Sequence, residues 1–162
     1  MNTNQQFRVF TARTAITLLV VLFANVTVWA VDPYRYCGVK YVLDQNTNTV
    51  YATQDEENIP KGNVQILNPV RFTSNGDLIP VTTIASSAFS GCGGVTKVTI
   101  PSTVTTIGSS AFLGCNQISE ITIPASVTII GNGAFDECSK LITVFMEGSV
   151  APTFGYAVFF ES

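Results

Sequence analysis

Cysteine is the residue type whose spacing first suggests chemistry in this chain. Three of the four cysteines, Cys92, Cys115 and Cys138, follow one another at equal intervals. Structural zinc sites use closely paired cysteines, which this wide spacing does not provide. The sequence also contains no histidine, so histidine metal ligands and Ser-His or Cys-His catalytic pairs are excluded. We therefore expect no metal and no cofactor.

Acidic residues are the second group that could do chemistry. Hydrolysis needs a carboxylate pair with one member desolvated, whereas Asp136 and Glu137 adjoin each other in an expected loop. The acidic stretch 54–58 lacks the alternating ligand spacing of a calcium loop, and we interpret it as a solvated loop. Residues 91–94 are glycine-rich but lack the lysine of a phosphate-binding loop. The sequence predicts a protein that is not an enzyme.

The charge pattern excludes one class of partner. Only 12% of the 162 residues are charged, and the formal net charge is −3. Binding to phosphates needs clustered lysines and arginines, but the eight basic residues are scattered along the chain. Nucleic acid is therefore not an expected partner.

The first thirty residues have the pattern of a signal peptide. Arg8 and Arg13 precede seventeen uncharged residues, and the small residue Ala30 follows Val28 by two positions. We predict cleavage between Ala30 and Val31, and therefore export without later membrane insertion. The alternative is an uncleaved anchor, which needs about 20 apolar residues, whereas this run is interrupted by Asn25.

A 23-residue repeat fills the second half of the chain. Residues 81–100 and 104–123 are identical at twelve of twenty positions. Most matching columns are apolar, which predicts coils that stack with each phenylalanine on the phenylalanine of the next coil. The predicted core columns are Val81/Val104/Val127, Ile84/Ile107/Ile130, Ala88/Ala111/Ala134, Phe89/Phe112/Phe135, Cys92/Cys115/Cys138, Val95/Ile118/Leu141, Val98/Ile121/Val144 and Ile100/Ile123/Met146.

The repeat resembles a known family. The pattern Ile-Pro-x-x-Val-x-x-Ile-Gly-x-x-Ala-Phe-x-x-Cys-x-x-Leu-x-x-Val, clearest in residues 123–144, is similar to the bacterial surface leucine-rich repeat of BspA-like type. The resemblance covers residues 78–146 and implies a mainly β repeat solenoid of leucine-rich-repeat-like right-handed coils. It also implies a bacterial cell-surface or secreted protein that meets other proteins, as in adhesion to a host or neighbouring cell.

Two expected β-hairpins form an N-terminal cap over residues 31–77. The first pairs residues 39–43 with 49–53, and the second pairs 69–73 with 78–81 around an Asn-Gly turn. Three repeats then occupy residues 78–146. Residues 147–162 are either a degenerate fourth coil or a C-terminal cap, with Ala157 and Val158 expected opposite Ala134 and Phe135 and with Phe159 one residue out of step.

Two columns carry predictions about local structure. Parallel side-chain directions within the cysteine column favour buried free thiols, although an exported protein can also form disulfides. The state of Cys37 is left open. Gly108 and Gly131 predict a backbone turn that a side chain would strain, whereas Ala85 in the same column predicts that φ need not be positive there.

The outward columns of the strand face are the expected ligand-binding residues, because the core columns are already committed to packing. Lys97 and Glu120 are expected to be lateral neighbours in a parallel sheet. Ile142 and Phe145 are either a partner-binding patch or, as we favour, a surface covered by the tail 154–160. The predicted ligand-binding set is Thr96, Lys97, Thr99, Ser119, Glu120, Thr122, Thr143 and Phe145.

Together these observations predict an exported protein that binds a protein partner through its strand face. Its expected location is the cell surface or the extracellular medium, with the periplasm as the alternative. The competing hypothesis is a structural envelope protein, or a truncated repeat fragment without a dedicated ligand.

Overall fold

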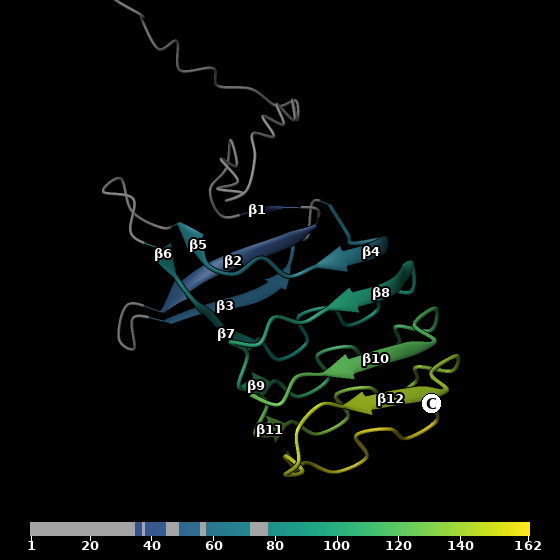
Figure 1. The fold of residues 1–162 in the computed structure, drawn as a ribbon. Helices are drawn as coiled ribbons and strands as arrows, with labels where there is room; N and C mark the ends of the chain where they lie inside the picture. Colours follow the sequence, from purple (N-terminus) through teal and green to yellow (C-terminus); the bar gives the residue numbers. More distant parts are fainter. Residues whose placement is uncertain (1–34, 37, 45–48, 56–57, 72–77) are drawn as a thin grey trace, which may run out of the picture. The chain divides into compact units, whose positions relative to one another are not determined.

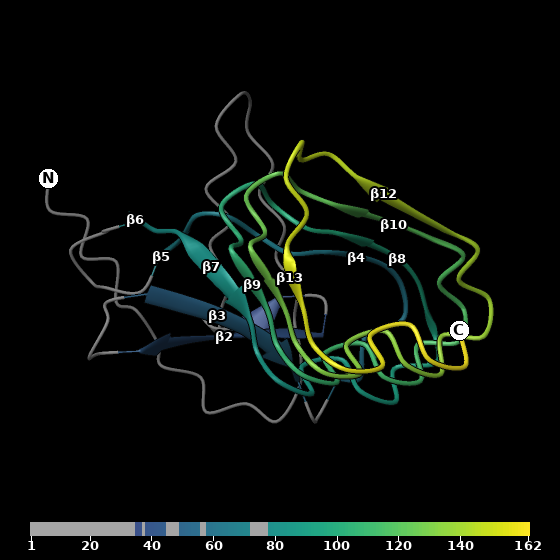
Figure 2. The same ribbon diagram turned by 90° about the horizontal axis from the view of Figure 1, so that it is seen from below.

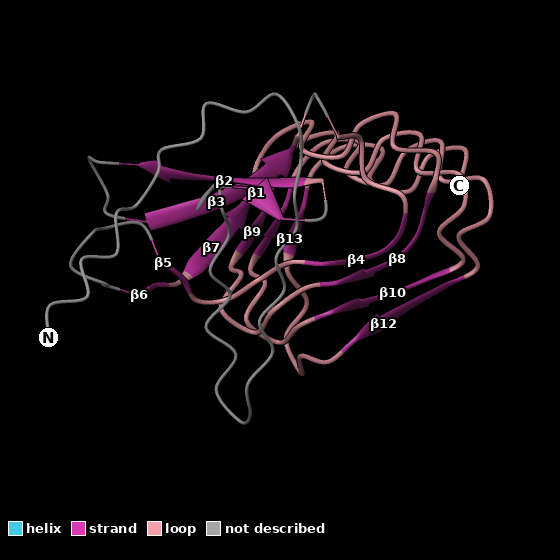
Figure 3. Cartoon of the chain, turned by 90° about the horizontal axis from the view of Figure 1, so that it is seen from above, coloured by secondary structure: helices cyan, strands magenta, loops and turns pink. Residues whose placement is uncertain are grey.

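The computed structural model of the chain describes residues 35, 36, 38–44, 49–55, 58–71 and 78–162. All of them belong to the unit Asp32–Ser162. The predicted signal peptide and Cys37 lie outside the described residues. Within the described part, the regular structure is strand, and no helix occurs (Figure 3).

One row of strands forms a seven-stranded sheet. Its first three strands are antiparallel, and β3 then pairs in parallel with β7, from which the parallel ladder continues through β9, β11 and β13. The strands are β1 (Arg35–Tyr36), β2 (Val39–Asp44), β3 (Thr49–Gln54), β7 (Val81–Ile84), β9 (Thr106–Ile107), β11 (Ile129–Ile130) and β13 (Thr153–Phe154).

A second row of strands lies across the repeats from the first, as Figure 2 shows. This row consists of two separate parallel pairs, β4 with β8 and β10 with β12. A short antiparallel pair, β5 with β6, lies between β4 and β7 in the sequence. The strands are β4 (Gly62–Gln65), β5 (Val70–Arg71), β6 (Leu78–Ile79), β8 (Val95–Thr99), β10 (Glu120–Ile123) and β12 (Thr143–Met146).

The 23-residue period sets the register between neighbouring repeats. Ile107 lies opposite Ile84 on one side and Ile130 on the other, and Ile121 lies opposite Val144. Equal spacing brings side chains of the same kind to the same place in each repeat. The prediction that these columns stack is therefore confirmed for these residues, whereas the core position predicted for Met146 is wrong, since this side chain is 39% exposed.

The centre of the stack is a column of phenylalanine rings. Phe89, Phe112 and Phe135 are fully buried. Adjacent rings are 5.2 Å apart between centroids and inclined by 7° and 5°. Burial of each large apolar side chain contributes about 1.5–3 kcal/mol, and this contribution accumulates with each added repeat.

The final segment keeps the same structure, but its register differs from the predicted one. Phe159, rather than Val158, stacks on Phe135, with ring centroids 5.5 Å apart. Phe135 N donates to Val158 O at 2.8 Å, as Phe112 N donates to Ala134 O in the preceding repeat. Val158 is thus the counterpart of Ala134. The register predicted for residues 157 and 158 is wrong because one extra residue precedes β13.

A glycine column marks the closest approach between neighbouring repeats. Gly108 and Gly131 do not have positive φ, as the alanine at position 85 indicated. A Cβ added at Gly108 would instead lie 2.7 Å from the carbonyl carbon of Ala85. A Cβ at Gly155 would lie 2.5 Å from Asn132 N, so Gly155 belongs to the same column. Close backbone approach, and not a turn, requires glycine here.

The first predicted hairpin is confirmed by β2 and β3, which pair from Val39 with Gln54 to Asp44 with Thr49. The second is present as β5 and β6, although its turn lies outside the described residues. The sequence pattern did not predict β4, whose Val64 and Gln65 lie opposite Val98 and Thr99. The β5–β6 hairpin lengthens the connection from β4 to β8 beyond the repeat period, and this hides β4 from a search for that period.

The solvated-loop interpretation of residues 54–58 is wrong for Asp55. This side chain is only 2% exposed and accepts a hydrogen bond from Asn58 Nδ2 at 3.0 Å. Asp55 N also donates to Gly38 O at 2.9 Å. Asp55 therefore holds the end of β3 against the start of β2.

Candidate functional site

The predicted ligand-binding residues lie on the row formed by β8, β10 and β12. β8 carries Thr96, Lys97 and Thr99; Ser119 precedes β10, which carries Glu120 and Thr122; β12 carries Thr143 and Phe145. All are exposed except Thr143, which is half-buried. The core residues of the same strands are buried, among them Val95 and Val98 of β8 and Ile121 and Ile123 of β10.

The structure does not place Lys97 and Glu120 side by side in one sheet. Lys97 lies opposite Asn63 of β4, and Glu120 lies opposite Thr143 of β12. No pairing joins β8 to β10. The predicted lateral pair is therefore wrong, because the row of strands is interrupted between the first and second repeats.

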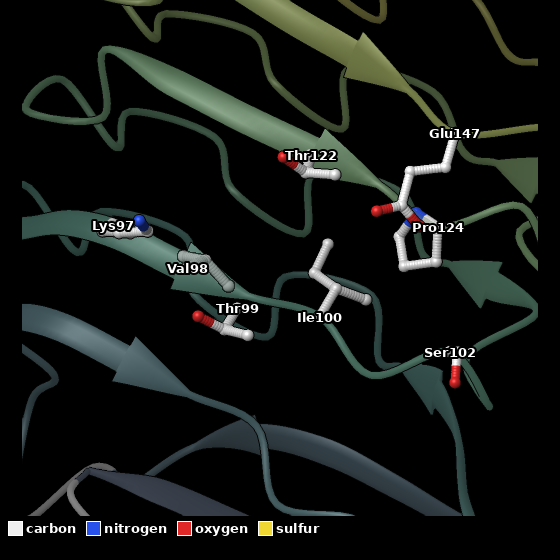
Figure 4. Close-up of a pocket in the computed structure, with 8 residues that line it drawn as sticks. All are labelled: Lys97, Val98, Thr99, Ile100, Ser102, Thr122, Pro124 and Glu147. Carbon is white, nitrogen blue, oxygen red and sulfur yellow. The ribbon is translucent and has the colours of Figure 1, made fainter.

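A cleft of about 400 Å³ lies at this interruption, and sequence reasoning missed it. Figure 4 shows β8 and β10 on its two sides, with Lys97 at one end and Glu147 at the other. No sequence signal marks the cleft, since residues 81–100 and 104–123 match closely. Its lining combines three hydroxyls, three apolar side chains and two opposite charges: Lys97, Val98, Thr99, Ile100, Ser102, Thr122, Pro124 and Glu147.

The exposed apolar residues of the last repeat are not covered by the tail. Ile142 is 87% exposed and Phe145 is 54% exposed. The tail rings pack elsewhere, because Phe159 stacks on Phe135 and contacts Phe154 at a centroid distance of 6.3 Å. The prediction that the tail covers Phe145 is therefore wrong, and the side chain is accessible on the strand face.

The cysteine column consists of buried free thiols, as predicted. Cys115 Sγ donates to Phe89 O and Cys138 Sγ donates to Phe112 O, both at 3.2 Å. Burial raises the pKa of the Cys92 and Cys115 thiols, and it raises the pKa of Cys138 to about 11. Nucleophilic attack requires the thiolate, so these thiols are poor nucleophiles in the folded protein.

No three histidine, cysteine, aspartate or glutamate side chains among the described residues are grouped so that they could hold a metal ion. The described part of the chain also contains no helix with the length and hydrophobicity needed to cross a bilayer.

Comparison with protein families identifies the repeat. A family described as the BspA type leucine rich repeat region matches residues 67–162, in six copies. The chain belongs to this family. The resemblance seen in the sequence is thereby confirmed, and the match of the BspA-type repeat extends through the final segment. No match was found among curated proteins.

Solved bacterial leucine-rich repeat proteins have similar structures. One from Bacteroides ovatus ATCC 8483 is 29% identical, with a TM-score of 0.63 over 79% of this BspA-type chain and 33% of that protein. The leucine-rich repeat protein of T. pallidum is 26% identical, with a TM-score of 0.58 over 75% of this chain and 53% of that one. One from Bacteroides capillosus ATCC 29799 is 25% identical, with a TM-score of 0.53 over 70% of this chain and 97% of that protein. The chain thus spans about a third of the first and about half of the second.

Proposed function

We propose that this BspA-type chain is an exported cell-surface or secreted protein that binds a protein partner through its strand face, as in adhesion to a host or neighbouring cell. The observation that carries the proposal is the exposure of this face. Its side chains contribute little to the core, and Phe145 is an exposed aromatic within it. Exposed aromatic residues are enriched where proteins bind one another.

The proposed architecture is a right-handed solenoid. Its parts are a cap over residues 31–77, three coils over 78–146 and a further partial coil or cap over 147–162. The thiol column supports the capping role, because Cys92 Sγ donates to Gln54 Oε1 at 3.2 Å. Gln54, in β3, thus supplies the acceptor that the phenylalanine carbonyls supply to the next two cysteines.

The proposed role is binding without catalysis. The three column thiols have raised pKa values and donate hydrogen bonds, which suits them to packing rather than to covalent chemistry. The scattered basic residues likewise favour a protein partner over a nucleic acid.

Site-directed photo-crosslinking on intact producing cells tests the proposal. A photoreactive side chain at Glu120 or Phe145 should give adducts with a partner protein. The matched control is Thr128, which is exposed beside β11 in the other row of strands. The substitution Phe145→Ser should reduce the adducts formed from Glu120 while leaving the melting temperature unchanged.

Adducts of equal yield from Thr128 would contradict binding through the strand face. The absence of adducts from all three positions would favour the alternative, a structural envelope protein or a fragment without a dedicated ligand.

A further inference from the structure

The interruption between β8 and β10 is confined to one row of strands. On the other side of the same repeats, β7, β9 and β11 pair without a break. Figure 1 shows β8 and β10 farther apart than β10 and β12. The repeats therefore remain joined along one edge while their strands separate along the other, and the cleft lies in the gap.

Backbone groups of both strands point into this gap. Thr99 O accepts a hydrogen bond from Ile66 N on the β4 side, and Ser119 O and Ile123 O accept from the β12 side. Because backbone groups alternate in direction along a strand, those of Val98, Glu120 and Thr122 face the cleft. Two strand edges that do not pair with each other thus face the same gap.

The side chains that line the cleft include one positive and one negative charge. Lys97, in β8, lies at one end of the cleft, and Glu147 lies at the opposite end (Figure 4). The apolar side chains of Val98 and Ile100 belong to the lining, and both are buried. An occupant that fits is extended, carries opposite charges at its two ends and offers backbone hydrogen bonds along its length.

We propose that the cleft between β8 and β10 binds an extended peptide segment of a partner protein as an added strand. The segment has an acidic side chain beside Lys97, a basic side chain beside Glu147 and alternating residues between them. Free strand edges favour such an occupant because an added strand pairs its own backbone with them. The inference rests on the proposed function and identifies what the strand face recognises.

Strand addition also requires the cleft to widen. A strand paired on both sides needs two spacings of about 4.8 Å between its neighbours. Some Cα atoms of β8 and β10 approach within 8 Å in the structure, so the peptide must part the strands further. The continuous β7–β9–β11 ladder keeps the repeats joined as the opposite edge opens.

A displayed library of random nonapeptides tests this inference on the protein purified from producing cells. Selection on the wild type is followed by counter-selection on Thr122→Trp, which fills the cleft. The control variant Thr128→Trp carries the same bulk beside β11 in the other row of strands, outside the cleft lining. The melting temperatures of both variants should match that of the wild type.

Peptides enriched on the wild type should bind Thr128→Trp equally well and Thr122→Trp at least about tenfold more weakly. N-methylation of alternate peptide amides should weaken binding by about tenfold or more, since it removes backbone hydrogen bonds. The double variant Lys97→Glu with Glu147→Lys should prefer the peptide whose terminal charges are exchanged.

Other results would overturn the inference in distinguishable ways. Peptides that still bind Thr122→Trp but no longer bind Phe145→Ser would place binding on the strand face outside the cleft. The proposed function would then hold, and the cleft proposal would be wrong. Binding that survives N-methylation would exclude strand addition. If no peptide is enriched on the wild type over Thr122→Trp, the cleft does not bind extended segments, and the crosslinking experiment separately decides whether the face binds a partner.

Discussion

At the scale of single residues, the cysteine column links each repeat to the one before it. Cys115 Sγ and Cys138 Sγ donate to the carbonyl groups of Phe89 and Phe112, so each thiol satisfies a backbone acceptor of the preceding repeat. Cys92 has only the hairpin before it and uses the side chain of Gln54. The thiols therefore contribute to cohesion as small buried side chains that also donate hydrogen bonds.

The raised thiol pKa values predict a loss of stability at alkaline pH. Well below pH 9, the ordinary thiol pKa, these thiols are neutral in both the folded and the unfolded chain. Between pH 9 and about 11 the unfolded chain loses the Cys138 proton first, so the free energy of unfolding falls. Urea denaturation at pH 7 to 11 measures this fall. The substitution Cys138→Ala should make the decline shallower, and an unchanged decline would contradict the prediction.

Gly108 lies where two repeats approach so closely that a larger side chain should destabilise the fold. The substitution Gly108→Ala should lower the free energy of unfolding by about 1–3 kcal/mol, because the new Cβ meets the backbone of Ala85 and Ser86. The control Gly93→Ala meets only the side chain of Asn116, at 3.3 Å, and should change stability by less than about 0.5 kcal/mol. Equal effects in chemical denaturation would show that close approach is not what requires glycine at position 108.

At the scale of elements, the N-terminal hairpin and the segment after it extend both rows of strands. β3 pairs with β7 in the first row, and the segment after it forms β4, which pairs with β8 in the second. β2 then pairs with the outer edge of β3, so the first row ends in antiparallel strands. This arrangement covers an edge that would otherwise be free to pair with another chain.

Tyr41 joins the hairpin to the second row and predicts a measurable contribution to stability. Its hydroxyl oxygen accepts a hydrogen bond from Leu67 N at 2.7 Å, and the side chain is 2% exposed. The substitution Tyr41→Phe should lower the free energy of unfolding by about 1–2 kcal/mol, because Leu67 N loses its acceptor. Thermal and urea denaturation measure the change.

Tyr51→Phe is the matched control, since Tyr51 lies in the neighbouring strand and is half-buried. A loss of stability as large in this variant as in Tyr41→Phe would mean that the hydrogen bond to Leu67 does not secure the hairpin.

At the scale of the whole molecule, the last repeat differs from the one before it in how far its core residues are buried. Ile123 is fully buried, whereas Met146, its counterpart one repeat later, is 39% exposed. The last repeat therefore presents part of its core to solvent beside the exposed Phe145. Apolar surface of this kind would strengthen contacts with other molecules.

The proposed export predicts a defined N-terminus. Protein recovered from the cell surface or the medium should begin at Val31, because the pattern of residues 1–30 places the cleavage site after Ala30. Mass spectrometry of peptides released by protease treatment of intact cells checks this. Recovery only after lysis of the outer envelope would indicate the periplasm and count against adhesion, and an intact peptide spanning residues 30 and 31 would contradict cleavage.

The sequence alone determined the repeat, most of its core residues and its family. A fixed period forces equivalent side chains into equivalent places, so the stacking of Phe89, Phe112 and Phe135 follows from spacing without knowledge of the fold. The buried free thiols follow for the same reason, and so does the exposure of Lys97 and Glu120 on the strand face.

Only the tertiary structure decided the features that depend on contacts between non-equivalent segments. β4 does not show in the repeat pattern because a hairpin lengthens its connection to β8. The final segment lies one residue out of the predicted register because it contains one residue more than the 23-residue period. Asp55 is buried where its backbone N–H donates to Gly38 O and its carboxylate accepts a hydrogen bond from Asn58. The cleft between β8 and β10 arises between repeats of nearly identical sequence, because the separation of strands is set by packing across the whole stack and not by the residues of one repeat.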